Sequence, residues 1–160
     1  MKIDEKSIVR PLPDDELFEY YENIYRLQSL PDDFINFMKN YNGATPISNT
    51  FNTHDNEYVI ERFLCMLDDY KSDEENGWYE IRVVFTQLDT RLIDDEDMVG
   101  TNILPIAALF SGDFLCLDFR KSDNPGVCVW FHEESDDFEP FTKEVAETFT
   151  EFLDMLRERS

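Results

Sequence analysis

The chain has 160 residues, 42% of them hydrophobic and 14% aromatic, which is enough for one packed core and too short for two comfortable domains. Its 36 acidic residues outnumber its 14 basic ones and leave a formal net charge of −22. Binding to nucleic acid or to an anionic membrane needs a patch of Lys and Arg, so this charge disfavours the first and excludes the second. We expect one domain over residues 1–160, with its core over about residues 12–156.

The start of the chain and its cysteines favour a cytoplasmic protein. Met1 is followed by a polar stretch without the apolar segment of a signal peptide, and no apolar run approaches the roughly 18 residues of a membrane span. The three cysteines are an odd number and form no CxxC motif. We therefore expect reduced thiols and a cytoplasmic location.

An extended lead-in and then two short helices are predicted first. Asp14 or Asp15 is a suitable cap for a helix that runs to about Gln28, because apolar residues recur there at steps of three and four. The next helix has Pro-Asp-Asp in its first turn. Gly43 is typical of a helix end and closes it.

The middle of the chain predicts strands and then a third helix. Residues 44–67 have β-propensity, with residues 58–64 as the return strand. Residues 68–77 are acidic and polar and are typical of a loop. From Trp78 to Leu92, apolar residues recur at helical spacing, although Val83-Val84-Phe85 also suits a strand.

The last third completes a fold of the α+β class. Residues 102–110 predict a strand, and Pro105 places that strand at an edge of the sheet or at a bulge. The stretch GDFLCLDFRKSDNPGVCVWFHEES predicts a hairpin closed by residues 121–126, and Thr142 is expected to cap a last helix that runs to about Glu158. The prediction is a single domain with a central antiparallel sheet of about five to six strands, flanked by about four helices.

Motifs of nucleotide and hydrolase chemistry are missing from the sequence. It contains no GxGxxG, GxxxxGK[ST], GxSxG or HExxH pattern. The window from Asp123 to Glu134 has the length of a calcium-binding loop, but Cys128 stands where that loop needs Gly. We therefore expect no enzyme, no cofactor and no metal site.

Cys116, Cys128 and His132 are the residues closest to a metal-binding set. If Phe119 pairs with Val127, Cys116 faces Trp130 and lies only diagonal to Cys128. Both cysteines alternate with apolar residues, which is typical of buried structural thiols, and His132 is expected at the surface. The hypothesis of a tetrahedral metal site therefore ranks below that of core cysteines.

Asp118 has two interpretations. It lies on a strand whose two faces are both apolar, so it is a candidate for a perturbed carboxylate in a pocket with His132 and Trp130, as in an enzyme or small-ligand binder. The favoured interpretation is a carboxylate paired with Arg120 or Lys121 at the strand end, because charges are seldom buried without partners.

Two groups of residues resemble a known family. Leu30-Pro31-Asp32-Asp33-Phe34, Phe37-Met38 and Tyr41-Asn42-Gly43-Ala44 match the pattern LPxdfxxFlxxyNGg, and Leu104-Pro105-Ile106-Ala107, Gly112–Asp118 and Val127, Trp130, His132, Glu133 match ipiaxxgxGdxlcld…vyxwdHe. These are patterns of the SUKH superfamily, also called Smi/Knr, and the whole chain is similar to its bacterial members of the YobK type. The resemblance implies an α+β fold without catalytic residues and an immunity protein, or antitoxin, that neutralises a toxin's nuclease domain. Fungal relatives are cell-wall signalling proteins, so the alternative is a signalling or scaffold module with another protein partner.

The charge of the chain suits the partner that the resemblance implies. A nuclease active site must attract phosphate and is basic, so a strongly acidic inhibitor complements it. The best candidates for a docking face are two runs of acids: Asp94, Asp95, Glu96 and Asp97, and Glu133, Glu134, Asp136 and Asp137. We expect these to bind the basic C-terminal domain of a cognate toxin, with no direct nucleic acid and no membrane as partner.

Overall fold

A computed structural model describes residues 1–27, 29–53, 56–92, 103–120, 124–131 and 142–159. Its elements in chain order are β1 (Ile3–Asp4), the 3₁₀ turn η1 (Glu5–Ser7), α1 (Asp15–Ile24), α2 (Asp32–Tyr41), β2 (Thr45–Pro46), β3 (Thr50–Thr53), β4 (Asn56–Phe63), η2 (Tyr70–Ser72), η3 (Gly77–Tyr79), α3 (Ile81–Leu92), β5 (Ile103–Leu109), β6 (Phe114–Asp118), β7 (Gly126–Trp130), β8 (Thr142–Ala146) and α4 (Phe149–Met155). None of the helices in these ranges is both long and apolar enough to cross a membrane.

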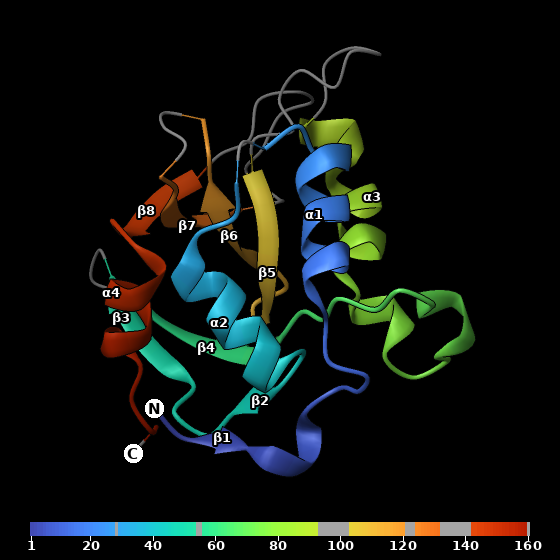
Figure 1. Ribbon diagram of the computed structural model, residues 1–160. Helices are drawn as coiled ribbons and strands as arrows, with labels where there is room; N and C mark the ends of the chain where they lie inside the picture. Colours follow the sequence, from blue (N-terminus) through green and yellow to red (C-terminus); the bar gives the residue numbers. More distant parts are fainter. Residues whose placement is uncertain (28, 54–55, 93–102, 121–123, 132–141, 160) are drawn as a thin grey trace.

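The core of the molecule is a six-stranded sheet in the order β3-β4-β5-β6-β7-β8 (Figure 1). Every neighbouring pair is antiparallel and follows the chain order, so the sheet is a meander. Residues 1–13, expected as an extended lead-in, contribute β1, which pairs with β2 in a separate two-stranded sheet. The predicted α+β class, with an antiparallel sheet of six strands and four α-helices, is confirmed.

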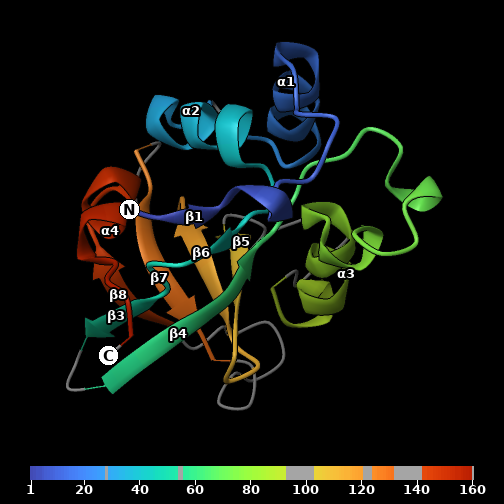
Figure 2. The same cartoon turned by 90° about the horizontal axis from the view of Figure 1, so that it is seen from below.

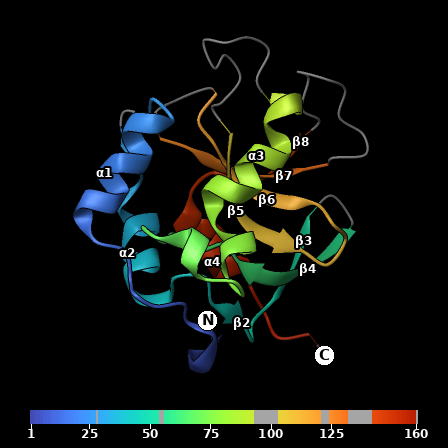
Figure 3. The same ribbon diagram turned by 90° about the vertical axis from the view of Figure 1, so that its right-hand side faces the viewer.

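The helices cover both faces of this sheet (Figure 2). Phe37 of α2 packs on Phe63 of β4, whose register partner on β5 is Ala107. The next residue, Ala108, faces the opposite side because strand side chains alternate, and there it lines a hollow together with Val84 of α3. Therefore α2 lies on one face and α3 on the other, against β5 (Figure 3).

Helix α4 joins the two edges of the curled sheet. It contacts β7 and β8 at one edge, while its Phe152 packs edge-to-face on Phe51 of β3 at the other edge, with ring centroids 5.2 Å apart. Phe149 contacts Phe34 and Phe37 of α2 at 5.3 Å in each case. These aromatic rings fill the space between the helices and the concave face of the sheet.

The first two helices begin where the sequence predicts. The Asp14 carboxylate accepts a hydrogen bond from the Leu17 amide and caps α1, and α2 ends at Asn42 and Gly43. Gly43 has a φ of +65°, and a Cβ there would lie 2.7 Å from the Cβ of Cys65 and from the Cγ2 of Val9. The position requires glycine for both reasons. The first helix is shorter than predicted, since α1 ends at Ile24.

The prediction of one helix from Thr142 to Glu158 is wrong. Thr142–Ala146 form β8, because their backbone groups complete the edge of β7, a pairing that local sequence cannot reveal. The helix starts only after Thr148, whose hydroxyl accepts a hydrogen bond from the Glu151 amide at 3.0 Å. Threonine followed three residues later by glutamate is a capping signature, and it marks the true start.

The prediction for Pro105 is half right. The strand β5 is not an edge strand, because it lies between β4 and β6. Its register shifts between Pro105 and Ala107, which is the predicted bulge. A bulge lets a residue without an N–H sit inside a sheet.

A buried charged cluster connects α1 to the start of α3. Glu80 is fully buried, accepts a hydrogen bond from the Tyr21 hydroxyl and forms an ion pair with Arg82 at 2.8 Å. Arg82 also donates to the carbonyl of Leu67, and its guanidinium lies 4.5 Å from the ring centre of Tyr70. Burial raises the pKa of Glu80, while hydrogen bonds from Arg82 and Tyr21 oppose that rise. Burial and then the charge of Glu80 raise the pKa of Tyr21 well above its ordinary value.

We expect Tyr21→Phe to lower the free energy of unfolding by about 1.5–3 kcal/mol, because it removes a hydrogen bond to a buried charged carboxylate. Tyr20→Phe is the matched control, since Tyr20 is 47% exposed and its ring contact with Arg82 survives the change. The control is expected to change stability by less than about 0.5 kcal/mol. Urea unfolding of both variants measures the difference, and equal losses would remove the assigned role of the hydroxyl.

The raised pKa of Glu80 predicts a pH dependence with a definite sign. The folded state holds the proton on Glu80 more tightly than the unfolded state, so this group stabilises the fold at low pH, and that contribution is lost as pH rises through the raised pKa. The unfolding free energy of the wild type minus that of Glu80→Gln should therefore fall over the range that runs upward from about pH 4, the ordinary pKa of a glutamate, through the raised pKa of Glu80. Urea unfolding of both proteins across that range tests this, and a difference that grows with pH would contradict it.

Candidate functional site

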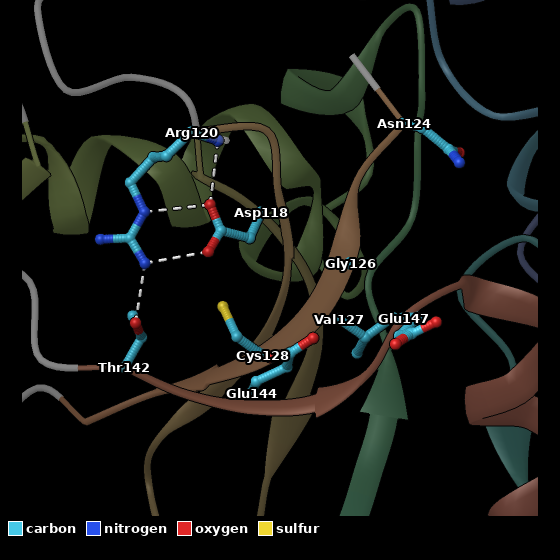
Figure 4. A pocket seen from close by; sticks show the side chains of 9 residues that line it. All are labelled: Asp118, Arg120, Asn124, Gly126, Val127, Cys128, Thr142, Glu144 and Glu147. Carbon is cyan, nitrogen blue, oxygen red and sulfur yellow. Dashed lines mark hydrogen bonds and ion pairs between the residues drawn. The ribbon is translucent and has the colours of Figure 1, made fainter. Parts of the chain in front are cut away.

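A hollow of about 310 Å³ lies over the ends of β6, β7 and β8 (Figure 4). Its lining comes from three strands and their flanking residues: Asp118, Arg120, Asn124, Gly126, Val127, Cys128, Thr142, Glu144 and Glu147. The register explains the assembly, because Asp118 pairs with Gly126, and Cys128 pairs with Glu144. Strand pairing thus brings residues 118 and 144 to one face of the sheet.

Arg120 and Asp118 form the fixed part of this hollow. The guanidinium donates to both carboxylate oxygens, from Nε to Oδ1 at 3.0 Å and from Nη2 to Oδ2 at 2.9 Å, and Nη2 also donates to the Thr142 hydroxyl at 2.8 Å. Figure 4 shows this fork and the link to Thr142. The hydrogen bonds with Asp118 raise the pKa of Arg120. The favoured interpretation of Asp118, a carboxylate paired with Arg120, is confirmed.

The two cysteines of the hairpin are direct cross-strand partners, which corrects the expected register. Leu117 rather than Phe119 pairs with Val127, so Cys116 faces Cys128 and Phe114 faces Trp130. Both cysteines are free and buried. Burial raises the pKa of the Cys128 thiol to about 12 and that of Cys116 well above its ordinary value. They are core thiols rather than nucleophiles, because the thiolate is the reactive form.

The lining of the hollow is weakly acidic. Three carboxylates, those of Asp118, Glu144 and Glu147, line the hollow together with one guanidinium, that of Arg120, which leaves a formal excess of two negative charges. The guanidinium is already held by Asp118, and Glu144 and Glu147 are exposed. Such a lining suits contact with a basic side chain rather than nucleophilic attack.

The residues predicted for docking lie outside the described part of the chain. Asp94, Asp95, Glu96 and Asp97 belong to the connection between α3 and β5, and Glu133, Glu134, Asp136 and Asp137 to that between β7 and β8. His132 also lies outside it, so the pocket imagined for Asp118, His132 and Trp130 is only partly described. Trp130 is 1% exposed and does not line the hollow. Among the residues that the structure describes, no group of three or more His, Cys, Asp or Glu is placed to hold a metal ion.

Sequence reasoning missed a second surface feature, which consists of two exposed aromatic side chains. Trp78 in η3 is 69% exposed, and Phe110 in the turn between β5 and β6 is 67% exposed. Trp78 was expected as the start of an amphipathic helix, but α3 begins only at Ile81. The one available signal was the acidic segment directly before Trp78, which places it outside the apolar core.

The buried thiols give a chemical test of this description. Cys65, Cys116 and Cys128 are each at most 2% exposed, and burial also raises the pKa of Cys65 to about 12. At about pH 8 less than roughly one thiol in a thousand is then ionised. We expect no reaction of the folded protein with a thiol-reactive disulfide reagent within minutes, and three reacting thiols in guanidinium chloride. Fast labelling of one thiol in the folded protein would contradict the assignment of core cysteines.

Comparison with known proteins agrees with the fold and the hairpin. The family model described as "SMI1-KNR4 cell-wall", of the SUKH group, matches residues 15–153, which is most of the chain. No curated protein and no solved structure matches the chain significantly. The narrower resemblance to the YobK type therefore stays a prediction. The match spans the six-stranded sheet, the helices α1, α2 and α3 and the start of α4, and the chain belongs to the SMI1-KNR4 family of the SUKH superfamily.

Proposed function

We propose that this chain is an immunity protein that binds a basic nuclease toxin and neutralises it by covering its active site. The observation that carries the proposal is a net charge of −22 on a member of a family of immunity-like and Smi/Knr-type domains. Self-repulsion of that size lowers the stability of the compact state, so it calls for a compensating role. A basic partner supplies one, because binding relieves the repulsion.

The described ion pairs leave the surface strongly acidic. Salt bridges join these six bases to carboxylates: Lys2, Lys39, Arg82, Arg120, Arg157 and Arg159. At least six of the 14 bases therefore have their charge offset inside the molecule, and the acids still outnumber all bases by 22. A partner that approaches this protein meets a negative potential.

Inhibition by such a protein needs binding and no chemistry. A nuclease must attract phosphate, so its active site presents basic residues, and opposite fields raise the rate of encounter. A standard interface covers about 800 Å² on each partner, which a domain of this size provides. The proposed mechanism is stoichiometric occlusion in the cytoplasm of the producing cell.

The two acidic runs remain our proposal for the docking face. The run Glu133–Asp137 is flanked by Trp130 on β7 and Thr142 on β8, which are register partners. The connection between these two strands therefore starts and ends at the same end of the sheet. Thr142 also binds Arg120 in the hollow of Figure 4, beside Glu144. Thr142, the first described residue after this run, thus lies beside the carboxylates of the hollow.

We expect the chain to co-purify with the product of an adjacent gene that encodes a basic toxin domain. The affinity of the pair should fall about tenfold or more between about 0.05 M and about 0.5 M NaCl, since salt screens opposite charges. Reversal of acids in the runs, as Asp94→Lys/Glu96→Lys or Glu133→Lys/Asp136→Lys, should lower affinity and abolish protection of cells from the toxin. Calorimetry and a growth assay measure these effects.

The control carries the same change in charge at distant positions. Glu19 on α1 and Asp154 on α4 are both exposed, and Glu19→Lys/Asp154→Lys raises the net charge from −22 to −18, as each double reversal in the runs does. This control should keep protection. An affinity that does not change with salt concentration would contradict the electrostatic part of the proposal. The absence of any basic partner would contradict the whole proposal.

The family description favours one other candidate function. It names cell-wall proteins, so a signalling or scaffold module with a different protein partner is the alternative. The genes beside this one separate the two. A neighbour that encodes a long secreted protein with a nuclease-like C-terminus supports the immunity protein, and its absence supports the module.

A further inference from the structure

Two large aromatic side chains are exposed on a molecule that buries most of its apolar residues. Trp78 is 69% exposed and Phe110 is 67% exposed, more than any other large hydrophobic side chain of the described residues. The other tryptophan, Trp130, is 1% exposed. Tryptophan and phenylalanine each offer about 150–250 Å² for burial, so leaving these two side chains exposed forgoes a sizeable hydrophobic stabilisation.

Trp78 lines a hollow of about 240 Å³, and Phe110 lies in the turn next to that hollow along the chain. Trp78 lines it together with Leu109 and Gly112, the residues on either side of Phe110-Ser111 in the turn between β5 and β6. The floor is apolar and includes Val84 of α3 and Ala108, Leu109 and Phe114 of the sheet. On its other side, Trp78 lines a second hollow of about 370 Å³ with Tyr70 and Val83. Trp78 is therefore a ridge between two depressions.

The backbone holds Trp78 in this position. The Gly77 amide donates to the carbonyl of Asp73 at 2.9 Å, and a Cβ at Gly77 would lie 2.5 Å from the carbonyl oxygen of Tyr70. On the following residue, Tyr79, the guanidinium of Arg62 lies 4.2 Å from the ring centre. The exposed ring thus stands on a packed support, and such a preorganised anchor loses little entropy on binding.

Acidic residues surround the aromatic ridge. The segment 68–75, which ends two residues before Gly77, contains five acids and one lysine, a formal charge of −4 from five negative and one positive. Asp68, Asp69, Glu74 and Glu75 are exposed, and hydrogen bonds from Asn76 and Glu75 hold the pKa of Asp73 below its ordinary value. Glu61 and Asp113 line the first hollow on the opposite side of Trp78.

We infer that the Trp78 surface, formed by residues 68–75, Trp78 and Phe110, docks an arginine-rich surface of a basic protein. A guanidinium stacks on an indole face and pairs with a neighbouring carboxylate at the same time, and exposed Trp is enriched among the residues that dominate binding energy. A second copy of this chain would bring two acidic segments together, so charge opposes self-association through this surface. The choice of a basic protein as the partner rests on the proposed function. The assignment of the surface rests on the exposure of Trp78 and Phe110, the packed backbone below Trp78 and the acidic residues around it.

Quenching of tryptophan fluorescence reports on Trp78, because the other tryptophan, Trp130, is buried. The full-length protein is titrated at low salt with a synthetic peptide of eight arginines and, in a second arm, with the basic domain encoded by the adjacent gene. Binding is followed by calorimetry, and acrylamide quenching of tryptophan emission is measured before and after saturation. We expect quenching of Trp78 to fall at least about twofold when either probe is bound, since the ring becomes covered.

Matched variants locate the effect. Trp78→Ala should weaken binding about tenfold or more, Trp78→Phe should restore part of it, and Glu74→Lys/Glu75→Lys should weaken it about tenfold. Ile47→Ala is the apolar control, because Ile47 is 47% exposed outside both hollows. Glu19→Lys/Asp154→Lys is the charge control, which gives the same net charge of −18, as −22 plus two changes of +2. Both controls should bind within about threefold of the wild type.

The outcomes separate this inference from the proposed function. If the toxin domain binds but Trp78 stays equally quenchable, or the charge control weakens binding as much as Glu74→Lys/Glu75→Lys, the Trp78 surface is rejected and the immunity role stands. If no basic domain binds while the arginine peptide still protects Trp78, the surface stands and the toxin proposal fails. Self-association on sedimentation that shields Trp78 would overturn the assignment of a basic partner.

Discussion

The buried carboxylate of Glu80 is the interaction on which the arrangement of the other parts depends. It holds Tyr21 of α1 and Arg82 of α3, and through Arg82 the carbonyl of Leu67. A buried ion pair is costly to break from one side, because the remaining charge has no partner, typically by about 3–5 kcal/mol. Since Glu80 directly follows η3, the same cluster fixes the turn that presents Trp78. Glu80 thus links the packing of the core to the position of the exposed Trp78.

Much of the fold follows from local sequence signals, and the errors arise where pairing is not local. Capping and helix-ending residues predict the start of α1 and both ends of α2, because the effects of Asp14 and Gly43 depend only on residues next to them in the chain. The strand β8 was mistaken for the start of a helix, because only β7 determines that Thr142–Ala146 extend. The central place of β5 and the pairing of Cys116 with Cys128 depend on register between distant segments, which propensity does not encode.

The candidate surfaces were predictable to different degrees. The pairing of Asp118 with Arg120 followed from the cost of burying a charge alone, whereas the link from Arg120 to Thr142 needed the return of β8. The helical spacing after Trp78 pointed to a core position, because tryptophan next to apolar residues is usually core, and only the acidic segment before it pointed the other way. The family resemblance, carried by the helix pattern and the hairpin pattern, is confirmed by the match over residues 15–153.

The outer edge of β3 is completed by a residue far along the chain. Thr50 exchanges two backbone hydrogen bonds with Arg157, at 2.9 and 3.0 Å, and Arg157 also pairs with Glu57 on β4. During synthesis, more than a hundred residues must follow Thr50 before this edge is closed, so the concave face stays open until α4 has left the ribosome. Because β8 directly precedes α4 in the chain, the sheet itself is complete only shortly before α4 covers its aromatic core. A nascent chain interrupted before Phe149 would lack both the covering rings of α4 and the Thr50–Arg157 pair, and it would carry the full acidic segment 68–75 on an unfinished fold.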